Sequence, residues 1–294
     1  MTLRFDDIGN RLKAFRLASG MSADDIAARI GISRAALYRY EKGEVAKIET
    51  LERLAELLDV SVPTLLGVGV EYVASAVAFF ERMRQIEETT EHMIVLFGPV
   101  SYLLTSDDFD AGLETVLTES LPEGIANRER SLADVAEIMQ ILRARKEAFH
   151  RRSPSIVSLV AAGEIARFLR NGFVGTMDLP ARVLRKRRRL AADEVERIAV
   201  IMEDEPIGVQ IGIVRDTMPN TSFQIFRQPD RPVLAVSPFR LGEQPNVRIG
   251  VGMITSAPEA LSLHERTAEE LWRGALKGRD AAAFVRALIE RHGC

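Results

Sequence analysis

The sequence has a single cysteine, Cys294, at its last position. A lone cysteine excludes an intrachain disulfide and a multi-cysteine metal site. The four histidines are scattered, without the spacing of a metal-ligand motif. No apolar run approaches the ~20 residues that span a bilayer, and the opening stretch MTLRFDDIGNRLK lacks the apolar core of a signal peptide. We therefore expect a cytoplasmic protein with no metal and no membrane partner.

Catalytic motifs are also missing. The chain has no Gly-Lys-Ser/Thr phosphate loop and no Gly-x-Ser-x-Gly nucleophile elbow. The stretch GVGMIT at 250–255 has two glycines but lacks the third of a dinucleotide fingerprint, and close strand packing explains it better. We predict that the protein is not an enzyme and has no cofactor.

What is present is the composition of a folded protein. The 294 residues are 47% hydrophobic and 28% charged, with 39 Lys+Arg against 42 Asp+Glu and a net charge of −3. This length permits two domains of ~100–200 residues each. Taken alone, a near-neutral net charge argues against a nucleic-acid partner. It is a sum over the whole chain, however, and such a sum can hide a local binding site.

Residues 1–69 predict five short helices with short connections. Ser22, Ser33 and Ser61 are suitable N-caps, and glycines follow the apolar stretches at positions such as 31 and 67. Helices two and three are separated by a short turn that contains Gly31. This is the arrangement of a helix-turn-helix, in which the second of the two helices enters the major groove of DNA.

The segments IGNRLKAFRLASGMS, DDIAARIGISRAALYRYEKG and LERLAELLDVSVPTLL closely resemble the Xre/Cro-type family of lambda-repressor-like domains. Their helix caps, turn glycines and apolar positions all match the pattern of that family, over about a fifth of the chain. The resemblance implies a compact all-α five-helix domain that binds operator DNA as a dimer.

The predicted recognition helix exposes polar side chains if Ile32, Leu37 and Tyr40 face inward. Arginine can pair with guanine and hydroxyls can contact base edges or phosphate, whereas free amides at a helix N-terminus favour phosphate. We assign base contacts to Ser33, Arg34 and Tyr38. The full set of candidate DNA-binding residues is Ser22, Ala23, Ser33, Arg34, Ala35, Tyr38, Arg39, Lys42 and Lys47. The alternative is a protein-interaction module with a solvated polar face.

Arg16 and Glu41 match family positions that pair helix one with helix three. The resemblance implies that such a pair fixes the recognition helix. The alternative is an exposed pair that contributes ~0–1 kcal/mol.

The first 70 residues contain ten Lys/Arg and ten Asp/Glu, so this region is neutral. A neutral domain used alone should bind DNA weakly. We therefore expect a homodimer, because two half-sites add their contacts.

Residues 70–92 predict a connecting amphipathic helix, with Val73, Val77, Phe80 and Ile86 among its apolar positions. It packs in the second domain or dimerises the protein. Residues 93–294 predict a mixed α/β (α+β) effector or dimerisation domain. Its expected strands lie at 156–160, 209–214, 223–226, 233–236 and 247–254, and its expected helices at 131–149, 163–169, 190–202, 263–276 and 281–291.

This second region resembles, more faintly, the effector domain of WhiJ-type regulators. The stretch RMRQIEETTEHMIVLFGPVSYLLTSDDF keeps Pro99 and the run 103–105 of that family's Val-Pro-Gly-Leu-Leu-Gln-Thr motif. RARKEAFHRRSPSIVSLVAAGEIARFL matches its basic helix, strand and helix. IGVQIGIV and SFQIFRQPDRPVLAVSPF match its paired strands. The resemblance implies a sensor or interaction role.

A basic cluster at 182–189 precedes the expected helix at 190. It is interpreted as a solvated face paired with the acidic segment 107–123, as a second phosphate-backbone contact, or as an anionic-ligand site. Polar residues at strand ends can also line a pocket, and the alternative is that they are ordinary turn residues. The candidate ligand or phosphate contacts are Arg185, Arg188, Arg215 and Arg240.

The sequence thus predicts a sequence-specific transcriptional regulator. Its N-terminal domain binds double-stranded operator DNA, and its C-terminal domain senses a small molecule or a protein partner. The alternative is an antitoxin-like or other protein-interaction regulator whose C-terminal domain binds a partner protein.

Overall fold

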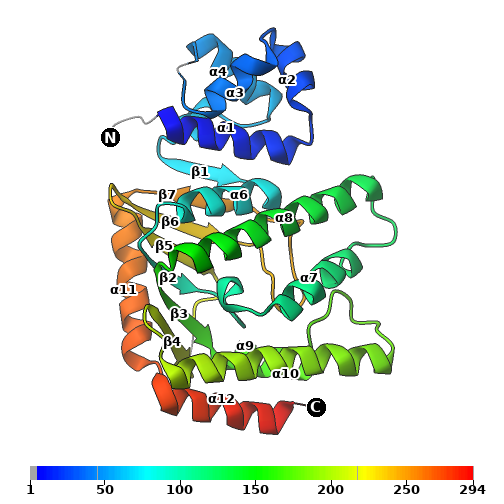
Figure 1. The fold of residues 1–294 in the computed structure, drawn as a ribbon, viewed down its shortest axis with the longest axis vertical. Helices are drawn as coiled ribbons and strands as arrows, with labels where there is room; N and C mark the ends of the chain where they lie inside the picture. Colours follow the sequence, from blue (N-terminus) through cyan, green and yellow to red (C-terminus); the bar gives the residue numbers. More distant parts are fainter. Residues whose placement is uncertain (1–4, 45, 217, 294) are drawn as a thin grey trace.

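The computed structural model describes residues 5–44, 46–216 and 218–293, and Figure 1 shows an α-helical N-terminal region at one end of a larger α/β region. The N-terminal helices are α1 (Phe5–Ser19), α2 (Ala23–Ile30), α3 (Arg34–Glu41), α4 (Ile48–Leu57) and α5 (Val62–Leu66). They enclose a small core to which Leu12, Ile26, Leu37, Leu54 and Leu65 each contribute a side chain at most 1% exposed. This confirms the predicted five-helix domain.

The rest of the chain forms a seven-stranded sheet in the order β1-β7-β6-β5-β2-β3-β4. The strands are β1 (Val70–Val73), β2 (His92–Leu96), β3 (Ser155–Ala161), β4 (Val209–Val214), β5 (Ser222–Arg227), β6 (Pro232–Ser237) and β7 (Gly252–Thr255). Strands β2, β3 and β4 pair in parallel, and the other neighbours pair antiparallel. The predicted mixed α/β class is therefore confirmed.

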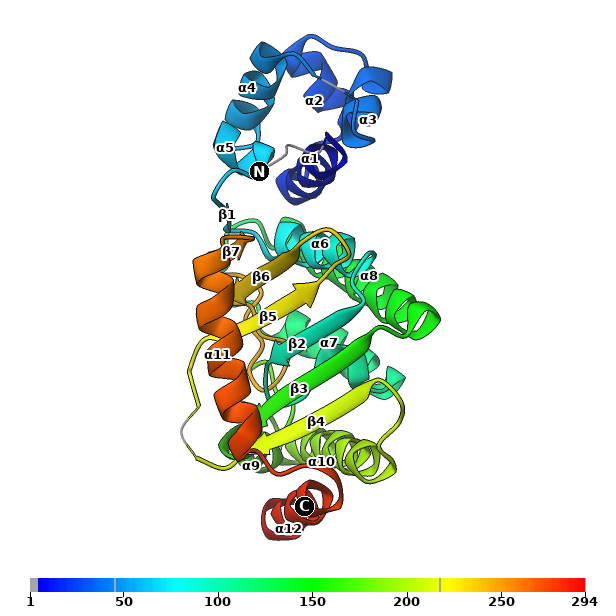
Figure 2. The same cartoon turned by 90° about the vertical axis from the view of Figure 1, so that its left-hand side faces the viewer.

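Helices cover both faces of this sheet. The helices of this region are α6 (Ala76–Glu87), α7 (Asp107–Glu119), α8 (Arg128–Arg152), α9 (Ala162–Asn171), α10 (Ala181–Asp204), α11 (Pro258–Gly274) and α12 (Gly278–His292), with a 3-10 turn at Tyr102–Leu104. Figure 2 shows α11 running across one face, where Leu261 and Ala268 pack against Leu159, Ile225 and Leu234 of the strands.

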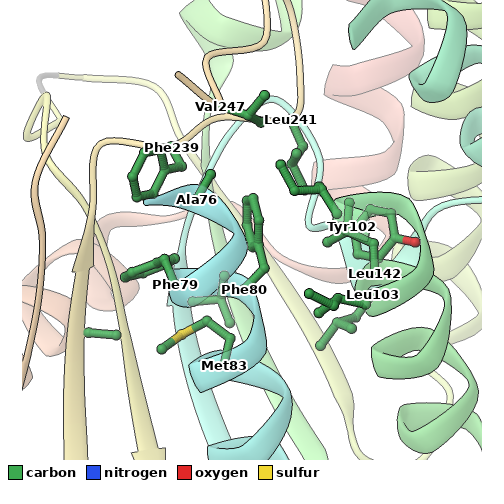
Figure 3. Packing of buried hydrophobic residues seen from close by; sticks show 14 of the residues in the cluster. Ala76, Phe79, Phe80, Met83, Tyr102, Leu103, Leu142, Phe239, Leu241 and Val247 are labelled. Carbon is green, nitrogen blue, oxygen red and sulfur yellow. The ribbon is translucent and has the colours of Figure 1, made fainter. Parts of the chain in front are cut away.

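The larger core lies on the opposite face. Phe79, Phe80 and Met83 of α6 point into it, and the two phenylalanine rings meet Phe239 from the segment after β6 (Figure 3). The Phe79 and Phe239 ring centroids lie 5.5 Å apart. Helix α6 therefore serves the core of the α/β region, the first of the two roles expected for its apolar face.

The expected helix over 70–92 is wrong at both ends. Residues Val70–Val73 form β1, which pairs with β7, and β2 begins at His92. The helical spacing from Val73 onward is real only within α6. Burial alternates along β1, because Glu71 and Val73 face inward while Tyr72 is 56% exposed. That two-residue period is the signal of a strand.

Three further boundaries differ from expectation. Of the expected strand 247–254, only residues 252–254 pair with neighbours, as part of β7; residues 247–249 are bends, and Gly250 follows them at φ +150°. The basic cluster at 182–189 lies within α10 and not before it. The acidic segment is largely the helix α7, capped by Ser106. Across the described residues, no helix is both long and apolar enough to cross a membrane.

Candidate nucleic-acid interface

Helices α2 and α3 form a helix-turn-helix whose ends are fixed by their own sequence. The Ser22 hydroxyl accepts a hydrogen bond from the Asp25 amide at 3.1 Å, and Ser33 accepts one from the Ala36 amide at 3.1 Å. Gly31 ends α2 in the left-handed region at φ +69° and donates its amide to carbonyls of that helix. These contacts confirm the capping residues predicted from the sequence.

The inner face of α3 packs on α1. Leu37 is fully buried, whereas Ile32 and Tyr40 are only half-buried. Gly9 of α1 lies so close that a Cβ atom there would sit 2.6 Å from the carbonyl oxygens of Tyr40 and Glu41. Glycine at this position lets α1 and α3 approach closely, so α1 sets the position of the recognition helix.

An ion pair reinforces the same contact. Arg16 of α1 donates through Nη2 to Glu41 Oε2 at 3.1 Å and through Nε to Oε1. The two side chains are 13% and 6% exposed. Burial opposes the charge of Arg16, but its hydrogen bond and attraction to Glu41 outweigh burial and raise its pKa. The structure therefore brings together the pair expected from the sequence, in a partly buried position.

The outer face of α3 carries most of the candidate contact residues. Those exposed to solvent are Ser33, Arg34, Ala35, Tyr38, Arg39 and Lys42. The Arg34 guanidinium lies over the Tyr38 ring at 5.4 Å from its centroid and reaches the phenol oxygen at 3.4 Å. This hydrogen bond, together with Asp24, raises the pKa of Arg34. The two side chains form a joint surface of cation and ring.

Carboxylates hold two of these arginines in the free protein. Arg34 Nη1 lies 3.1 Å from Asp24 Oδ2, and Arg39 Nε lies 3.1 Å from Glu44 Oε2. All four side chains are 57–68% exposed. Such solvated pairs contribute little, so an anionic ligand can replace the carboxylates at small cost.

Three candidates flank α3, and only two of them have exposed side chains. Ser22 and Lys47 are exposed, and Lys47 is the N-cap residue of α4. Ala23 is only 7% exposed because its methyl group packs into the domain core. The candidate contact at Ala23 is its backbone amide at the N-terminus of α2, and this assignment stays a prediction.

The four candidate ligand residues of the second domain do not share a site. Arg185 and Arg188 lie on α10; the former is exposed and the latter is half-buried beside Gly172. Arg215 follows β4 and Arg240 follows β6. Since β3, β2 and β5 separate β4 from β6, strand spacing alone puts about 19 Å between those two ends. The candidates on α10 and those at the strand ends therefore belong to separate places in the fold, and their roles stay predictions. No group of His, Cys, Asp or Glu within the described segments could hold a metal ion.

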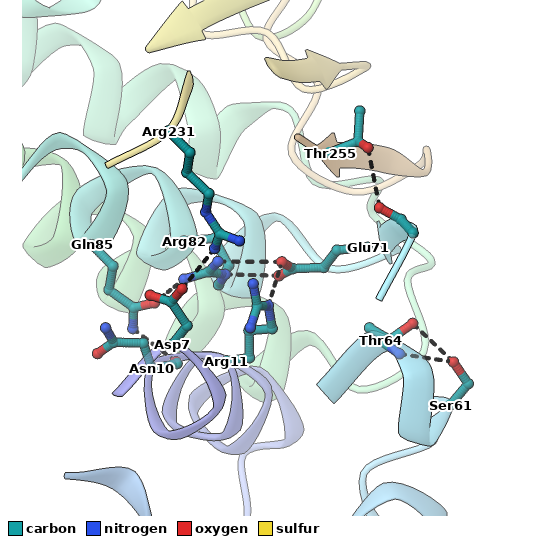
Figure 4. Close-up of polar contacts among 11 residues, drawn as sticks. Asp7, Asn10, Arg11, Ser61, Thr64, Glu71, Arg82, Gln85, Arg231 and Thr255 are labelled. Carbon is teal, nitrogen blue, oxygen red and sulfur yellow. Dashed lines mark hydrogen bonds and ion pairs between the residues drawn. The ribbon is translucent and has the colours of Figure 1, made fainter. Parts of the chain in front are cut away.

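A buried polar junction joins the two regions, and the sequence interpretation missed it. Glu71 of β1 accepts from Arg11 of α1 at 2.9 Å and from Arg82 of α6 at 2.7 and 3.2 Å (Figure 4). Each of the three side chains is at most 6% exposed. Burial, followed by the charge of Arg82, lowers the pKa of Arg11. The available signal was a charged residue at an inward position of a strand, since Glu71 alternates with exposed Tyr72.

Further contacts extend this junction along α1. Gln85 donates to the carbonyl of Asn10 at 2.9 Å, and Arg231 pairs with Asp7 at 2.6 Å. At the other end of α1, Arg130 of α8 donates to the carbonyl of Ala18 at 2.9 Å. A cleft of about 570 Å³ opens beside these contacts, lined by residues of α1, β1, α6 and the β7–α11 connection. Helix α1 thus contacts the α/β region on one side and the recognition helix on the other.

Comparison with known proteins identifies the N-terminal domain. Residues 12–65 match the family described as helix-turn-helix. A stretch of 52 residues is 48% identical to a protein of Pyrococcus horikoshii that is named as a candidate HTH-type transcriptional regulatory protein. The match covers 17% of this chain and 16% of that relative, so it spans about a sixth of each protein.

One solved structure, an archaeal chromatin protein called TrmBL2 and described as showing a novel mode of DNA binding, aligns over 86% of this chain and 68% of its own. The sequence identity is 12% and the TM-score is 0.31. A likeness of this size supports no inference about fold or function.

Proposed function

We propose that this protein is a sequence-specific, DNA-binding transcriptional regulator that places α3 in the major groove. The observation that supports it best is the outer face of α3, where Arg34, Tyr38 and Arg39 stand exposed on a helix-turn-helix fixed by α1. Arg34 and Tyr38 are suited to base edges, whereas Arg39, Lys42 and Lys47 are suited to phosphates. It acts in the cytoplasm and catalyses no reaction.

The regulator binds its operator as a homodimer. The first 70 residues are electrically neutral, and two of the arginines on α3 are already paired with carboxylates. One such domain gains little from counterion release, which drives much of DNA affinity. Two half-sites on a palindromic operator double the number of contacts and supply the missing affinity.

The α/β domain modulates this binding in response to a ligand or protein partner. The junction supports this role, because α1 contacts β1 and α6 on one side and α3 on the other. The cleft of about 570 Å³ beside the junction is large enough for a small molecule. The resemblance of the C-terminal region to WhiJ-type effector domains points to the same kind of role.

The decisive experiment selects binding sites for the full-length protein from random duplexes and then measures Arg34→Ala and Lys42→Ala on the selected operator. Arg34→Ala should cost about 1–3 kcal/mol at one base position and relax preference there. Lys42→Ala should weaken all duplexes alike and reduce the salt slope by about 0.9.

Wild-type affinity of both variants for the operator would refute the assignment of α3. Failure to enrich any sequence would refute sequence-specific recognition. The dimer is tested separately by sedimentation with a palindromic duplex, which should bind two protein chains, and with a half-site duplex, which should bind measurably weaker.

A further inference from the structure

The N-terminal half of α10 carries four cationic side chains on one face. They stand at positions i, i+3, i+4 and i+7, which lie together on a helix surface. This basic stripe consists of Arg182, Arg185, Lys186 and Arg189, and all four are exposed. The arginine between them faces inward: Arg187 is 8% exposed and pairs with Glu119 of α7 at 2.7 Å. The expected pairing with the acidic segment is thus met by Arg187, while the basic stripe faces solvent.

Within the described segments, the basic stripe lacks the close carboxylate partners that other arginines have. Among the residues that the structure describes, the ion pairs include none of its four side chains. The first turn of α10 has no acidic residue, and the helix dipole adds positive potential at that end. This differs from α3, where Arg34 and Arg39 each have a carboxylate 3.1 Å away.

The basic stripe lies far from the recognition helix. Figures 1 and 2 both place α10 and α12 at one end of the molecule and α2, α3 and α4 at the other. The whole α/β region separates them. A straight duplex bound to α3 therefore does not reach α10 of the same protein chain. The basic stripe must contact something other than that stretch of DNA.

We propose that the basic stripe binds the phosphate backbone of a second DNA duplex, independently of sequence. The eight residues from Arg182 to Arg189 cover about 10 Å of helix, and duplex DNA carries one charge per ~1.7 Å of its axis. Four flexible cations along that length match several successive phosphates. One chain then holds two duplexes, one at each end; this bridging, but not the backbone contact itself, rests on the proposed function of α3.

The test uses the full-length protein with the α3 cations removed (Arg34→Ala, Arg39→Ala and Lys42→Ala), so that binding through the recognition helix is suppressed. A 30-base-pair duplex without an operator is titrated by fluorescence anisotropy at several salt concentrations. Changing all four residues of the basic stripe to Gln should weaken binding at least about tenfold and lower the log–log salt slope by about 3–4.

Two controls separate a local site from net charge. Conversion of the three stripe arginines to Lys keeps the charge and should keep the affinity within about threefold. A matched variant removes four other exposed arginines, from α11 and α12: Arg266, Arg273, Arg279 and Arg291. Equal loss in this variant and in the stripe variant would overturn the proposal, as would unchanged duplex binding by the stripe variant.

Bridging is measured by energy transfer between two labelled duplexes, one with the selected operator and one without. The stripe variant should bind the operator normally and lose the transfer signal, whereas the α3 variant should lose operator binding but keep the stripe contact. Suppose that the α3 variant loses its preference for the operator, but the stripe variant gives the same energy transfer as the wild-type protein. This result overturns only the proposal for the basic stripe and leaves the function of α3 intact. If the basic stripe is needed for binding vesicles of anionic lipid but not for binding duplex, the proposal of a DNA partner is wrong.

Discussion

The recognition helix and the domain junction both pair arginine with carboxylate, in opposite surroundings. On α3, Arg34 and Arg39 hold Asp24 and Glu44 in solvent. At the junction, Glu71 lies between Arg11 and Arg82 with at most 6% exposure of any partner. Solvated pairs are exchangeable, because water screens them and replaces either partner at little cost. Buried pairs are fixed, because a charge left without its partner has no water to compensate it.

This difference divides the N-terminal domain into a binding side and an anchoring side. On the outer face of α3, the arginines can exchange their carboxylate partners for phosphates or base edges of DNA. Helix α1 cannot leave Glu71 without breaking the buried Arg11–Glu71 pair, which leaves Glu71 with Arg82 alone. We infer that the modulation proposed above would have to change the contacts of this junction in order to move α3.

The largest effect is expected at the centre of the junction. Glu71→Gln removes the negative charge and leaves Arg11 and Arg82 buried beside each other, which should lower the free energy of unfolding by about 3–5 kcal/mol. Denaturant unfolding checks this, and the N-terminal helices should become more accessible to limited proteolysis before the rest unfolds.

The matched control is Glu44→Gln, which breaks an exposed arginine–carboxylate pair on the DNA side. It should change stability by about 0–1 kcal/mol and should strengthen rather than weaken DNA binding, since Arg39 is released. Equal losses of stability in the two variants would remove the distinction between fixed and exchangeable pairs.

An intermediate case lies between α1 and α3. Arg16→Ala leaves Glu41 partly buried without its cation, at 6% exposure in the native protein. The expected cost is about 1–3 kcal/mol, the penalty for an unsatisfied buried polar group. Thermal unfolding of this variant is compared with Arg29→Ala, an exposed arginine on α2, which should melt close to the wild-type protein. Identical melting temperatures would show that Arg16 and Glu41 form only a surface pair.

The same contrast explains which parts of the fold could be read from the sequence. The N-terminal helices begin and end at local signals, such as the Ser22 and Ser33 caps and Gly31, so their boundaries followed directly. The position of β1 depends on β7, more than 170 residues away in the chain. Four residues are too few for their alternation to outweigh the helical spacing that follows, so the sequence predicts a helix where β1 lies.

The functional surfaces divide in the same way. The outward residues of α3 follow from helical spacing and a recognisable motif, and the structure places them together. Ala23, the first residue of α2, has its side chain in the core, so only its backbone amide can face a ligand. The Arg11–Glu71–Arg82 cluster joins three elements whose mutual placement only tertiary packing determines, so no local pattern could indicate it.

The smallest expected effect is a dependence of stability on pH. It distinguishes the two regions because they differ in histidine content. The first 69 residues contain no histidine, so any histidine-linked change of stability belongs to the α/β region. Burial, followed by the positive charge of Arg227, lowers the pKa of His92, whose Nδ1 lies 2.8 Å from the Ser155 hydroxyl. The unfolded chain then takes up a proton at higher pH than the folded chain does. Stability should therefore fall as pH drops below about 6.5 and level off beneath the folded pKa.

The size of that fall is under about 1 kcal/mol, because His92 is only half-buried and water screens it. His92→Gln should flatten the dependence of the unfolding midpoint on pH between 7.5 and 5, whereas His150→Gln, at an exposed position on α8, should leave it unchanged. Glu71→Gln should lower the midpoint by the same amount throughout that range, since neither guanidinium titrates there. The opposite result is a pH dependence that disappears in Glu71→Gln but persists in His92→Gln. It would mean that the junction itself responds to protons, so that its buried ion pairs exchange more readily than their burial implies.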